Sequence, residues 1–272
     1  MNLFSPSEFV LNYAAVGEGK AKAPAVRLFF LAILAGLLIA FGGAVTNTAT
    51  HALGNVSVVR IVSGLLFPFG LIMVVLTGAE LFTGNCLIAI SVLEKRATIP
   101  GMLRNLAIVY IGNFLGALLL AAACAFFGQL NYSAGGLAVA TIRLAAAKNA
   151  MPFLNAFILG VLCNILVCAA VMCALCAKDV FGRVVGAYVP IAVFVLCGFE
   201  HCVANMFYVP AGLFALTVPQ YAALAAQAGV ETAGLTWGGF LINNLLPVTL
   251  GNLAGGIAFA VLIGRCHAKA KA

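Results

Sequence analysis

The sequence predicts an all-α polytopic membrane protein whose six transmembrane helices form an inverted repeat of three plus three, with the second and fifth helices broken. Three observations carry this prediction. Of the 272 residues, 64% are hydrophobic and 8% are charged, whereas about a quarter of the residues in a water-soluble domain are charged. The apolar residues gather in six long runs, and motifs of the first half of the chain recur in the second half.

Two of the six apolar runs are too long for a single straight span. A bilayer core takes about 20 helical residues, and four of the runs match that length. The second and fifth would reach roughly 48 Å as straight helices, against a hydrocarbon core of about 30 Å. These two must tilt strongly, break or re-enter. The runs are Arg27–Val45, Ile61–Val92, Leu103–Phe127, Phe153–Cys176, Val184–Leu216 and Phe240–Ile263.

Basic residues predict how the spans are oriented, because cytoplasmic loops carry an excess of lysine and arginine. Eleven lie on the side of the N-terminus and three on the opposite side. Both termini are therefore predicted to be cytoplasmic, and the positive charge serves orientation rather than nucleic-acid binding. The first set is Lys20, Lys22, Arg27, Lys95, Arg96, Arg104, Lys178, Arg183, Arg265, Lys269 and Lys271; the second is Arg60, Arg143 and Lys148.

One transmembrane domain is expected, with an N-terminal surface helix within residues 1–26, the six-span bundle at 27–263 and a basic tail at 264–272. Residues 5–16 predict the surface helix. Ser5-Pro6-Ser7-Glu8 combines a capping serine, a proline in the first helical position and a glutamate three residues after the cap. Phe9, Tyr13 and Val16 then recur at helical spacing. A simple anchor at the membrane surface fits this pattern; a movable plug is the alternative. No cleaved signal is expected at the start.

Three pairs of segments indicate the internal repeat. "GAELFTGN" at 78–85 and "GFEHCVAN" at 198–205 both read Gly-x-Glu-x-x-x-x-Asn, and "IGNFLGA" at 111–117 matches "LGNLAGG" at 250–256. "AILAGLLIA" at 32–40 lies beside "FILGVLCN" at 157–164, with Gly36 opposite Gly160. Because three is odd, the second copy must enter the membrane from the other side. Inverted repeats place substrate sites near the midplane, often where helices are broken.

The paired motifs also carry the residues that a broken helix needs. A break frees backbone N–H and C=O groups that hydrocarbon cannot satisfy. Asparagines can supply both donors and acceptors, glutamates can accept from the N–H groups that begin a half-helix, and glycines permit unusual backbone angles. We therefore interpret both glutamates as structural first. The predicted support residues are Gly78, Gly198, Glu80, Glu200, Asn85, Asn205, Asn113 and Asn252.

His201 stands apart from this scaffold. Its counterpart in the first repeat is Leu81, so the repeat alone does not require it, and the other two histidines, His51 and His267, lie outside the spans. An ionisable residue inside a membrane is a functional hypothesis by default. The alternative is a neutral histidine that is hydrogen-bonded in the core. Asn205 would lie one turn along on the same helix face.

Other classes of protein lack their required residues here. A water or glycerol pore would carry two Asn-Pro-Ala motifs, a haem-bearing subunit paired intramembrane histidines, and a zinc hydrolase His-Glu-x-x-His; none occurs in the sequence. Eight of the nine cysteines lie in apolar surroundings, and Cys173-x-x-Cys176 has no partner ligands nearby, so they are expected to pack as small hydrophobes. No catalytic residue, cofactor or metal site is predicted.

Several segments together resemble a known family. "GAELFTGN", "GNFLGALLL", "GFEHCVANMFYVPAG" and "NNLLPVTLGN" look like the signature segments of the formate/nitrite transporter family, over nearly the whole chain. The stretch "FEHCVANMFYVPAG" is closer to its formate and hydrosulfide channels than to its nitrite branch. The resemblance implies a homopentamer in a prokaryotic plasma membrane, with an aquaporin-like fold and one pore in each protomer.

The resemblance also implies roles for particular residues. Span two would be interrupted by an Ω-shaped loop at Leu81, Phe82, Thr83 and Gly84, and span five just before His201. The central and substrate-path positions would be His201, Thr83, Asn164, Asn252, Glu200 and the vestibule lysine Lys148. The apolar constrictions would involve Phe67, Leu71, Leu81, Phe82, Val167 and Phe194.

The expected function is bidirectional, pH-dependent passage of a small monovalent weak acid, formate first, with nitrite, hydrosulfide or lactate as alternatives. A bare anion in an apolar medium faces a cost of tens of kcal/mol, so its charge must be removed or balanced. In one solution the anion gains a proton in the vestibule or through His201 and crosses as the neutral acid. In the other, His201 is positively charged and acts as counter-ion; an imidazole titrates near cellular pH. Channel and proton-coupled carrier both stay open.

Overall fold

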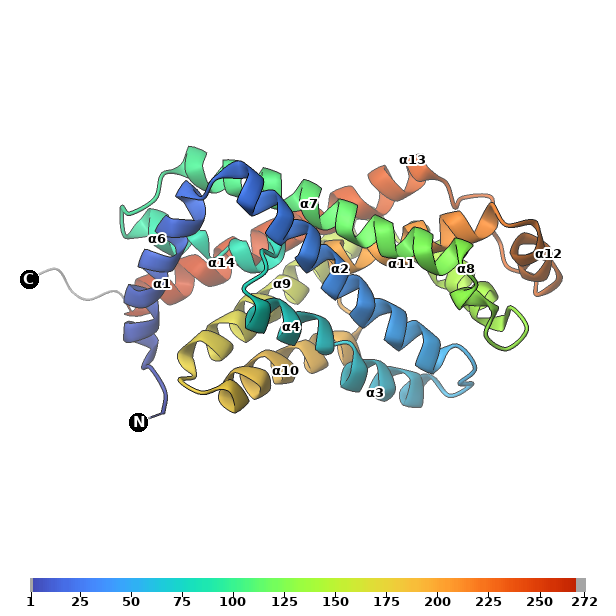
Figure 1. Cartoon of the computed structure of the whole chain (residues 1–272), viewed down its shortest axis with the longest axis horizontal. Coiled ribbons are helices and arrows are strands. Elements are labelled where there is room, and N and C mark those ends of the chain that lie inside the picture. Colours follow the sequence, from blue (N-terminus) through green and yellow to red (C-terminus); the bar gives the residue numbers. More distant parts are fainter. Residues whose placement is uncertain (1, 268–272) are drawn as a thin grey trace, which may run out of the picture.

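The computed structural model describes residues 2–267, which form an elongated bundle of helices (Figure 1). The start of α1 and the end of the last helix, at His267, lie at one end of the bundle, together with α6. We call this the inner end, and the end that carries α8, α12 and α13 the outer end. Lys269 and Lys271 of the predicted basic tail lie outside the described residues.

Within residues 2–267, six helical segments are long and apolar enough to cross a membrane, which confirms the predicted class. The spans extend a few residues beyond most of the apolar runs, because polar helix ends continue past the hydrocarbon-length core. The segments are α2 (Ala25–Thr50), α3 with α4 (Val56–Leu66, Phe69–Thr77), α7 (Ile99–Phe126), α9 (Phe153–Cys176), α10 (Val180–Cys197), and α13, η2 and α14 (Trp237–Gly239, Phe240–Leu245, Leu246–His267).

Spans two and five are both broken, as the sequence predicts. After α4 the chain turns at Gly78 and restarts in α5 (Phe82–Asn85) and α6 (Ile88–Leu93) toward the inner end. After α10 it turns at Gly198 and restarts in α11 (Cys202–Leu216) toward the outer end. The two glycines have φ angles of 69° and 73°, a left-handed conformation that side chains with a Cβ disfavour. Each break is thus set by a glycine at the first position of the repeated motif.

The N-terminal helix α1 (Pro6–Lys22) is longer than the predicted 5–16 segment. Its capping box forms as expected, since the Ser5 hydroxyl accepts from the Glu8 N–H and the Glu8 carboxylate accepts from the Ser5 N–H at 2.7 Å. Phe9 and Tyr13 are buried, whereas Val16 faces a cavity. The helix packs chiefly against α6 across the inner end.

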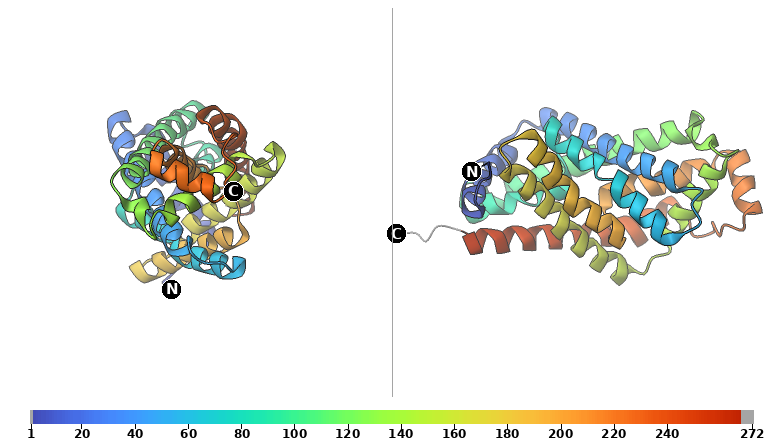
Figure 2. Two further views of the ribbon diagram at one scale, coloured as in Figure 1. Left: turned by 90° about the vertical axis from the view of Figure 1, so that its right-hand side faces the viewer. Right: turned by 90° about the horizontal axis from the view of Figure 1, so that it is seen from below.

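The outer end has a matching helix, α8 (Gly136–Asn149), which packs against α11 and α12 (Pro219–Gln227). Seen from below, α1 and α8 lie at opposite ends of the same bundle (right panel of Figure 2). The repeat unit is therefore larger than three spans. Each copy begins with a short helix at one end of the bundle, before its first span.

Equivalent backbone contacts within the two repeats correct one predicted pairing. The Glu80 N–H donates to Leu31 O, and the Glu200 N–H donates to Leu159 O. Leu31 is thus the counterpart of Leu159, so Gly36 corresponds to Asn164 and the predicted Gly36–Gly160 pairing is wrong. The error is four residues, or about one helical turn. A slip of one turn keeps the same helix face toward the core, so the apolar pattern could not reveal it.

The two break glycines give a stability prediction. An alanine at either position meets the left-handed strain, which costs about 1–2 kcal/mol. At Gly78 a Cβ would touch nothing, but at Gly198 it would lie 2.9 Å from Arg60 Nη1. Because the exposed Arg60 guanidinium can move aside, we expect Gly198→Ala and Gly78→Ala to lower the thermal midpoint in detergent by similar amounts. Adding Arg60→Ala to Gly198→Ala should recover little; a large recovery would contradict the backbone origin of the loss.

Candidate functional site

His201 lies at the break in span five and joins the two broken spans. It is the N-cap of α11, where its Nδ1 accepts the Ala204 N–H at 3.1 Å. Its Nε2 lies 2.9 Å from Oγ1 of Thr83, in α5 of span two. Because Nδ1 accepts a backbone N–H, the proton of the neutral ring is on Nε2 and is donated to Thr83. The imidazole is 3% exposed, so this donor lies in the interior of the bundle.

Aromatic rings cover one side of this imidazole. Phe194 of α10 lies 6.0 Å from the His201 ring, and Phe67, between α3 and α4, lies 5.8 Å from Phe194 in an edge-on contact. Both phenylalanines are buried. The structure thus brings together two predicted constriction residues and the central histidine in one stack.

The remaining predicted constriction residues lie elsewhere around the break. Leu71 and Leu81 line the cavity on the inner side, and Val167 of α9 is buried. The Phe82 ring packs on Tyr110 at 4.8 Å and faces a groove between α7 and the η2–α14 segment. Phe82 therefore points away from the His201 stack.

Two asparagines bracket the breaks in the same way in both repeats. Asn252 accepts the Cys202 N–H at 2.9 Å and donates to Glu200 O and Gly160 O. Asn113 accepts the Phe82 N–H at 2.9 Å and donates to Glu80 O and Ala32 O. Each amide thus satisfies backbone groups that the interruption would leave bare. This is the support that the repeated Gly-Asn-x-x-Gly motif predicts.

Asn164 links the backbone of Asn252 to the backbone of Thr83 in the other break. Its amide donates to Asn252 O at 2.6 Å and to Thr83 O at 3.3 Å. Its repeat counterpart is Gly36, which packs directly on the Asn113 backbone. The second repeat therefore has an asparagine where the first has only close backbone contact. This amide holds the peptide of Thr83, whose hydroxyl meets His201.

Each break also carries a buried tetrad of one lysine, one glutamate and two asparagines. In the outer tetrad, Lys148 Nζ lies 2.7 Å from Glu200 Oε1, and Asn205 donates to both Glu200 and Asn244. Asn244 donates in turn to Lys148 O at 3.0 Å. The ring of bonds ties α8, the break, α11 and η2 together.

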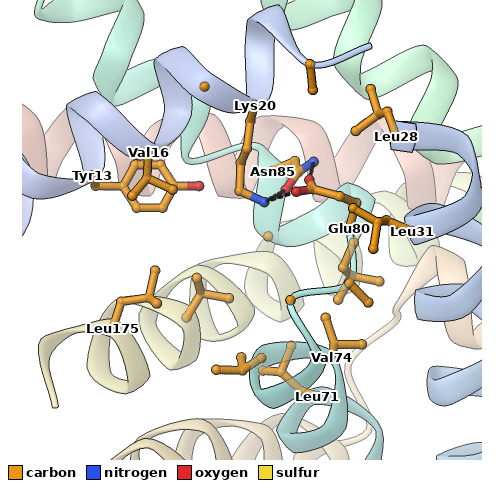
Figure 3. Close-up of a pocket in the computed structure, with 18 of the residues that line it drawn as sticks. Tyr13, Val16, Lys20, Leu28, Leu31, Leu71, Val74, Glu80, Asn85 and Leu175 are labelled. Carbon is orange, nitrogen blue, oxygen red and sulfur yellow. Dashed lines mark hydrogen bonds and ion pairs between the residues drawn. The ribbon is translucent and has the colours of Figure 1, made fainter. Parts of the chain in front are cut away.

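The inner tetrad repeats this pattern with Lys20, Glu80, Asn85 and Asn105. Lys20 Nζ lies 2.7 Å from Glu80 Oε1, and Asn85 donates to Glu80 (Figure 3). Asn85 also donates to Asn105. Asn105 donates to Lys20 O at 2.9 Å. The sequence reasoning missed Asn105, Asn244 and the role of Lys20. A signal was present, because Lys20 precedes Lys148 by the same interval as Leu31 precedes Leu159.

The two tetrads differ in how the lysine is held. Lys20 Nζ also contacts Asn85 Oδ1 at 3.1 Å. Lys148 Nζ instead takes both oxygens of Glu200, at 2.7 and 3.0 Å, which leaves Asn205 Oδ1 buried and without a partner among the described residues. The Lys148 charge is thus neutralised by a carboxylate that is itself buried.

A cavity of about 440 Å³ opens beside the inner tetrad. Residues Tyr13, Val16 and Lys20 of α1 form one wall, and leucines and valines of α4 and α9 form another (Figure 3). Gly78 and Glu80 of the break lie at its end. The N-terminal helix therefore contributes directly to the wall of the inner vestibule rather than only resting on the membrane surface.

Comparison with known proteins identifies the family. A family model described as formate/nitrite transporter matches residues 7–265. The chain belongs to the formate/nitrite transporter family. Members of this family are transport proteins, and the predicted transport role, as opposed to an enzymatic one, is confirmed by this membership.

Curated relatives of this formate/nitrite transporter cover most of its length. It is 37% identical over 277 residues to a probable formate transporter of Methanothermobacter thermautotrophicus, with 95% of each chain covered. It is 39% identical over 222 residues to the formate channel FocA of Haemophilus influenzae, covering 80% of this chain and 77% of that one.

Solved structures agree with the fold. A pentameric formate channel with formate bound superposes with a TM-score of 0.77 at 36% identity, covering 88% of this chain and 95% of that one. An FNT family ion channel gives a TM-score of 0.81 at 25% identity, covering 97% of this chain and 99% of that one. The broken-helix architecture is thus shared with channels of this family.

The outer tetrad gives a second stability prediction. Lys148→Met would leave the Glu200 carboxylate buried and unpaired, which costs about 3–5 kcal/mol. The double variant Lys148→Met/Glu200→Gln removes both charges and should recover more than half of that loss. Unfolding midpoints in detergent measure both. Lys22→Met is the control, because its pair with Glu18 is exposed and should leave the midpoint unchanged. A double variant no more stable than Lys148→Met would contradict the pairing.

Proposed function

We propose that this protein conducts formate through a pore in each protomer of a homopentamer, across a prokaryotic plasma membrane, with both termini in the cytoplasm. The named relatives support the substrate and the assembly. The excess of basic residues on the side of the N-terminus supports the orientation. The observation that carries the proposal is the buried Nε2–H of His201, aimed at Thr83 beside a stack of phenylalanine rings.

The His201 geometry favours one of the two ways to handle the charge of the anion. A charged imidazolium needs a proton on Nδ1, but that nitrogen already accepts the Ala204 N–H. Positive charge on His201 would therefore break the cap of α11. A neutral ring keeps the cap and offers Nε2–H to a solute oxygen. We infer that the solute passes His201 as the protonated acid, having gained its proton in the vestibule.

Thr83 and His201 then act as a pair of hydrogen-bonding groups for the acid. The Nε2–H donates to the carbonyl oxygen of the solute, and Thr83 Oγ1 accepts from its O–H. These bonds replace water that the solute loses between the apolar rings. Asn164 and Asn252 have their amide hydrogens on backbone carbonyls, so we assign them the positioning of Thr83 and the break rather than direct contact with solute.

The proposed path predicts a dependence of flux on pH. The fraction of neutral acid rises as pH falls, so formate uptake should increase when the donor side is acidified. His201→Ala removes the Nε2–H donor and should lower formate flux in proteoliposomes roughly tenfold or more, the order of one lost buried hydrogen bond. The rise of flux at low pH should remain in this variant, because it comes from protonation of the solute and not of His201. A wild-type rate in this variant would disprove the role of His201, and a pH-independent flux would disprove protonation in the vestibule.

A matched control is His51→Ala. His51 lies at the outer end, where its ring is hydrogen-bonded to Thr48 O and Ser133 Oγ. Its substitution by alanine should leave the flux and the pH profile unchanged. The substrate is tested with formate, nitrite, hydrosulfide and lactate at two pH values. Formate should be fastest; a faster rate for another of the four would reassign the substrate while keeping the path.

A further inference from the structure

Arg60 is a cation near the break in span five that the mechanism above does not use. It lies in α3 on the outer side of the bundle, one turn from the start of the helix at Val56. The residue is exposed and makes no hydrogen bond or ion pair with any of residues 2–267. Lys148, the other basic group near this break, is already bonded to both oxygens of Glu200.

Helix geometry places Arg60 above the apolar stack. Arg60 precedes Phe67 by seven residues, which is almost two full helical turns, so both positions share one face of the helix. Phe67 contacts Phe194, which contacts His201. Arg60 therefore lies on the same helix face as Phe67, about two turns closer to the outer end of the bundle.

The guanidinium group also reaches the break itself. A Cβ built on Gly198 would lie 2.9 Å from Nη1, 3.1 Å from Cζ and 3.1 Å from Nη2 of Arg60. Three guanidinium atoms at nearly equal distance mean that the planar group lies flat over this glycine. The negative end of the α10 dipole, which terminates here, stabilises a cation at this point.

The internal repeat shows which side of the break Gly198 occupies. Gly78, the counterpart of Gly198, lines the inner cavity. Gly198 is the equivalent point of the outer break, and the Arg60 guanidinium lies over it. A Cβ on Gly78 would meet nothing within 4 Å. The inner break therefore has no side chain in the place that Arg60 occupies at the outer break. The repeat counterpart of Arg60 is Val180, and the scaffold alone therefore does not require a basic residue there.

We propose that Arg60 forms an anion-docking site in the outer vestibule, which binds the carboxylate of formate before it reaches the Phe67–Phe194 constriction. This inference rests on the proposed function. The planar guanidinium can donate two parallel hydrogen bonds to the two oxygens of a carboxylate. Because the group is exposed, the binding is weak and screened by salt, as rapid transfer to the protonation step requires.

The inner vestibule offers a parallel. Arg27 lines the inner cavity next to Lys20, is exposed, and has no hydrogen-bond or ion-pair partner within the described part of the chain. Its repeat counterpart is Asn155, so the two arginines are not repeat-related. Arg27 beside Lys20 and Arg60 beside the outer break are thus two arginines without a partner among the described residues, each near a lysine that a glutamate neutralises.

The test measures formate flux against formate concentration in right-side-out and inside-out vesicles. Arg60→Gln should raise the half-saturating concentration roughly three- to tenfold for formate entering from the outer face, the order of one exposed charge-assisted contact, and leave the saturated rate unchanged. Arg60→Lys keeps the charge but loses the planar fork, so its shift should be smaller. High salt should narrow all differences.

The matched control is Arg143→Gln. Arg143 is also exposed and belongs to the outer basic set, but it contacts Ala228 O of a peripheral helix end. It should behave as wild type. An Arg60→Gln variant that matches Arg143→Gln, or that lowers the saturated rate with an unchanged half-saturating concentration, overturns the docking site. If Arg60→Gln does not fold, the smaller shift in Arg60→Lys decides.

Two further measurements distinguish formate docking at Arg60 from a failure of formate transport and from lipid binding. In wild-type protein, formate should slow modification of Arg60 by phenylglyoxal, and not of Arg143, as read by mass spectrometry. This measurement does not depend on flux. If formate protects Arg60 but no formate flux is seen, the proposed function is wrong and the docking site stands. If formate does not protect Arg60, the docking site is wrong. An Arg60→Gln effect that is present only in vesicles with anionic lipid would assign Arg60 to lipid headgroups and overturn the inference.

Discussion

The fold depends on satisfying backbone groups at two points where a membrane helix is interrupted. Hydrocarbon cannot form a hydrogen bond with a free N–H or C=O, so a break is stable only if other groups of the protein supply the missing partners. Asn113 and Asn252 do so with the same three bonds at the two breaks. The hydrogen bonds of these two asparagines hold the chain at each glycine turn and the start of each half-helix, and they thereby place Thr83 against His201.

The scaffold is symmetric, but its chemistry is not. Asn113 and Asn252, the two break glycines and the two tetrads occupy equivalent places in the repeats. The functional groups occupy places where the repeats differ: His201 stands opposite Leu81, and Asn164 opposite Gly36. A symmetric scaffold would give two identical breaks with no hydrogen-bond donor facing the path. Divergence at these positions lets one break present the donor while the other contributes Thr83 and apolar walls.

The tetrads show why the vestibule lysines cannot be treated as free charges. Lys20 and Lys148 are each bonded to a buried glutamate at 2.7 Å. Removing one partner from such a pair leaves an uncompensated charge in the interior. The pairs thus stabilise the breaks first. Each lysine thus presents a compensated ion pair rather than a free charge. Arg27 and Arg60, which have no hydrogen-bond or ion-pair partner among residues 2–267, lie on separate helices.

The sequence by itself determined the membrane class, the six spans, the two breaks and the inverted repeat, because hydropathy, helix length and the repeated Gly-x-Glu-x-x-x-x-Asn motif are local properties of the chain. It also singled out His201, through its missing counterpart. Only the tertiary structure decided how the first span of one repeat aligns with the first span of the other, and that Lys20 pairs with Glu80. It also decided that Asn105 and Asn244 bond to Asn85 and Asn205. Those contacts join residues far apart in the chain, and a slip of one helical turn leaves the apolar face unchanged, so only backbone and side-chain contacts of the folded protein could fix them.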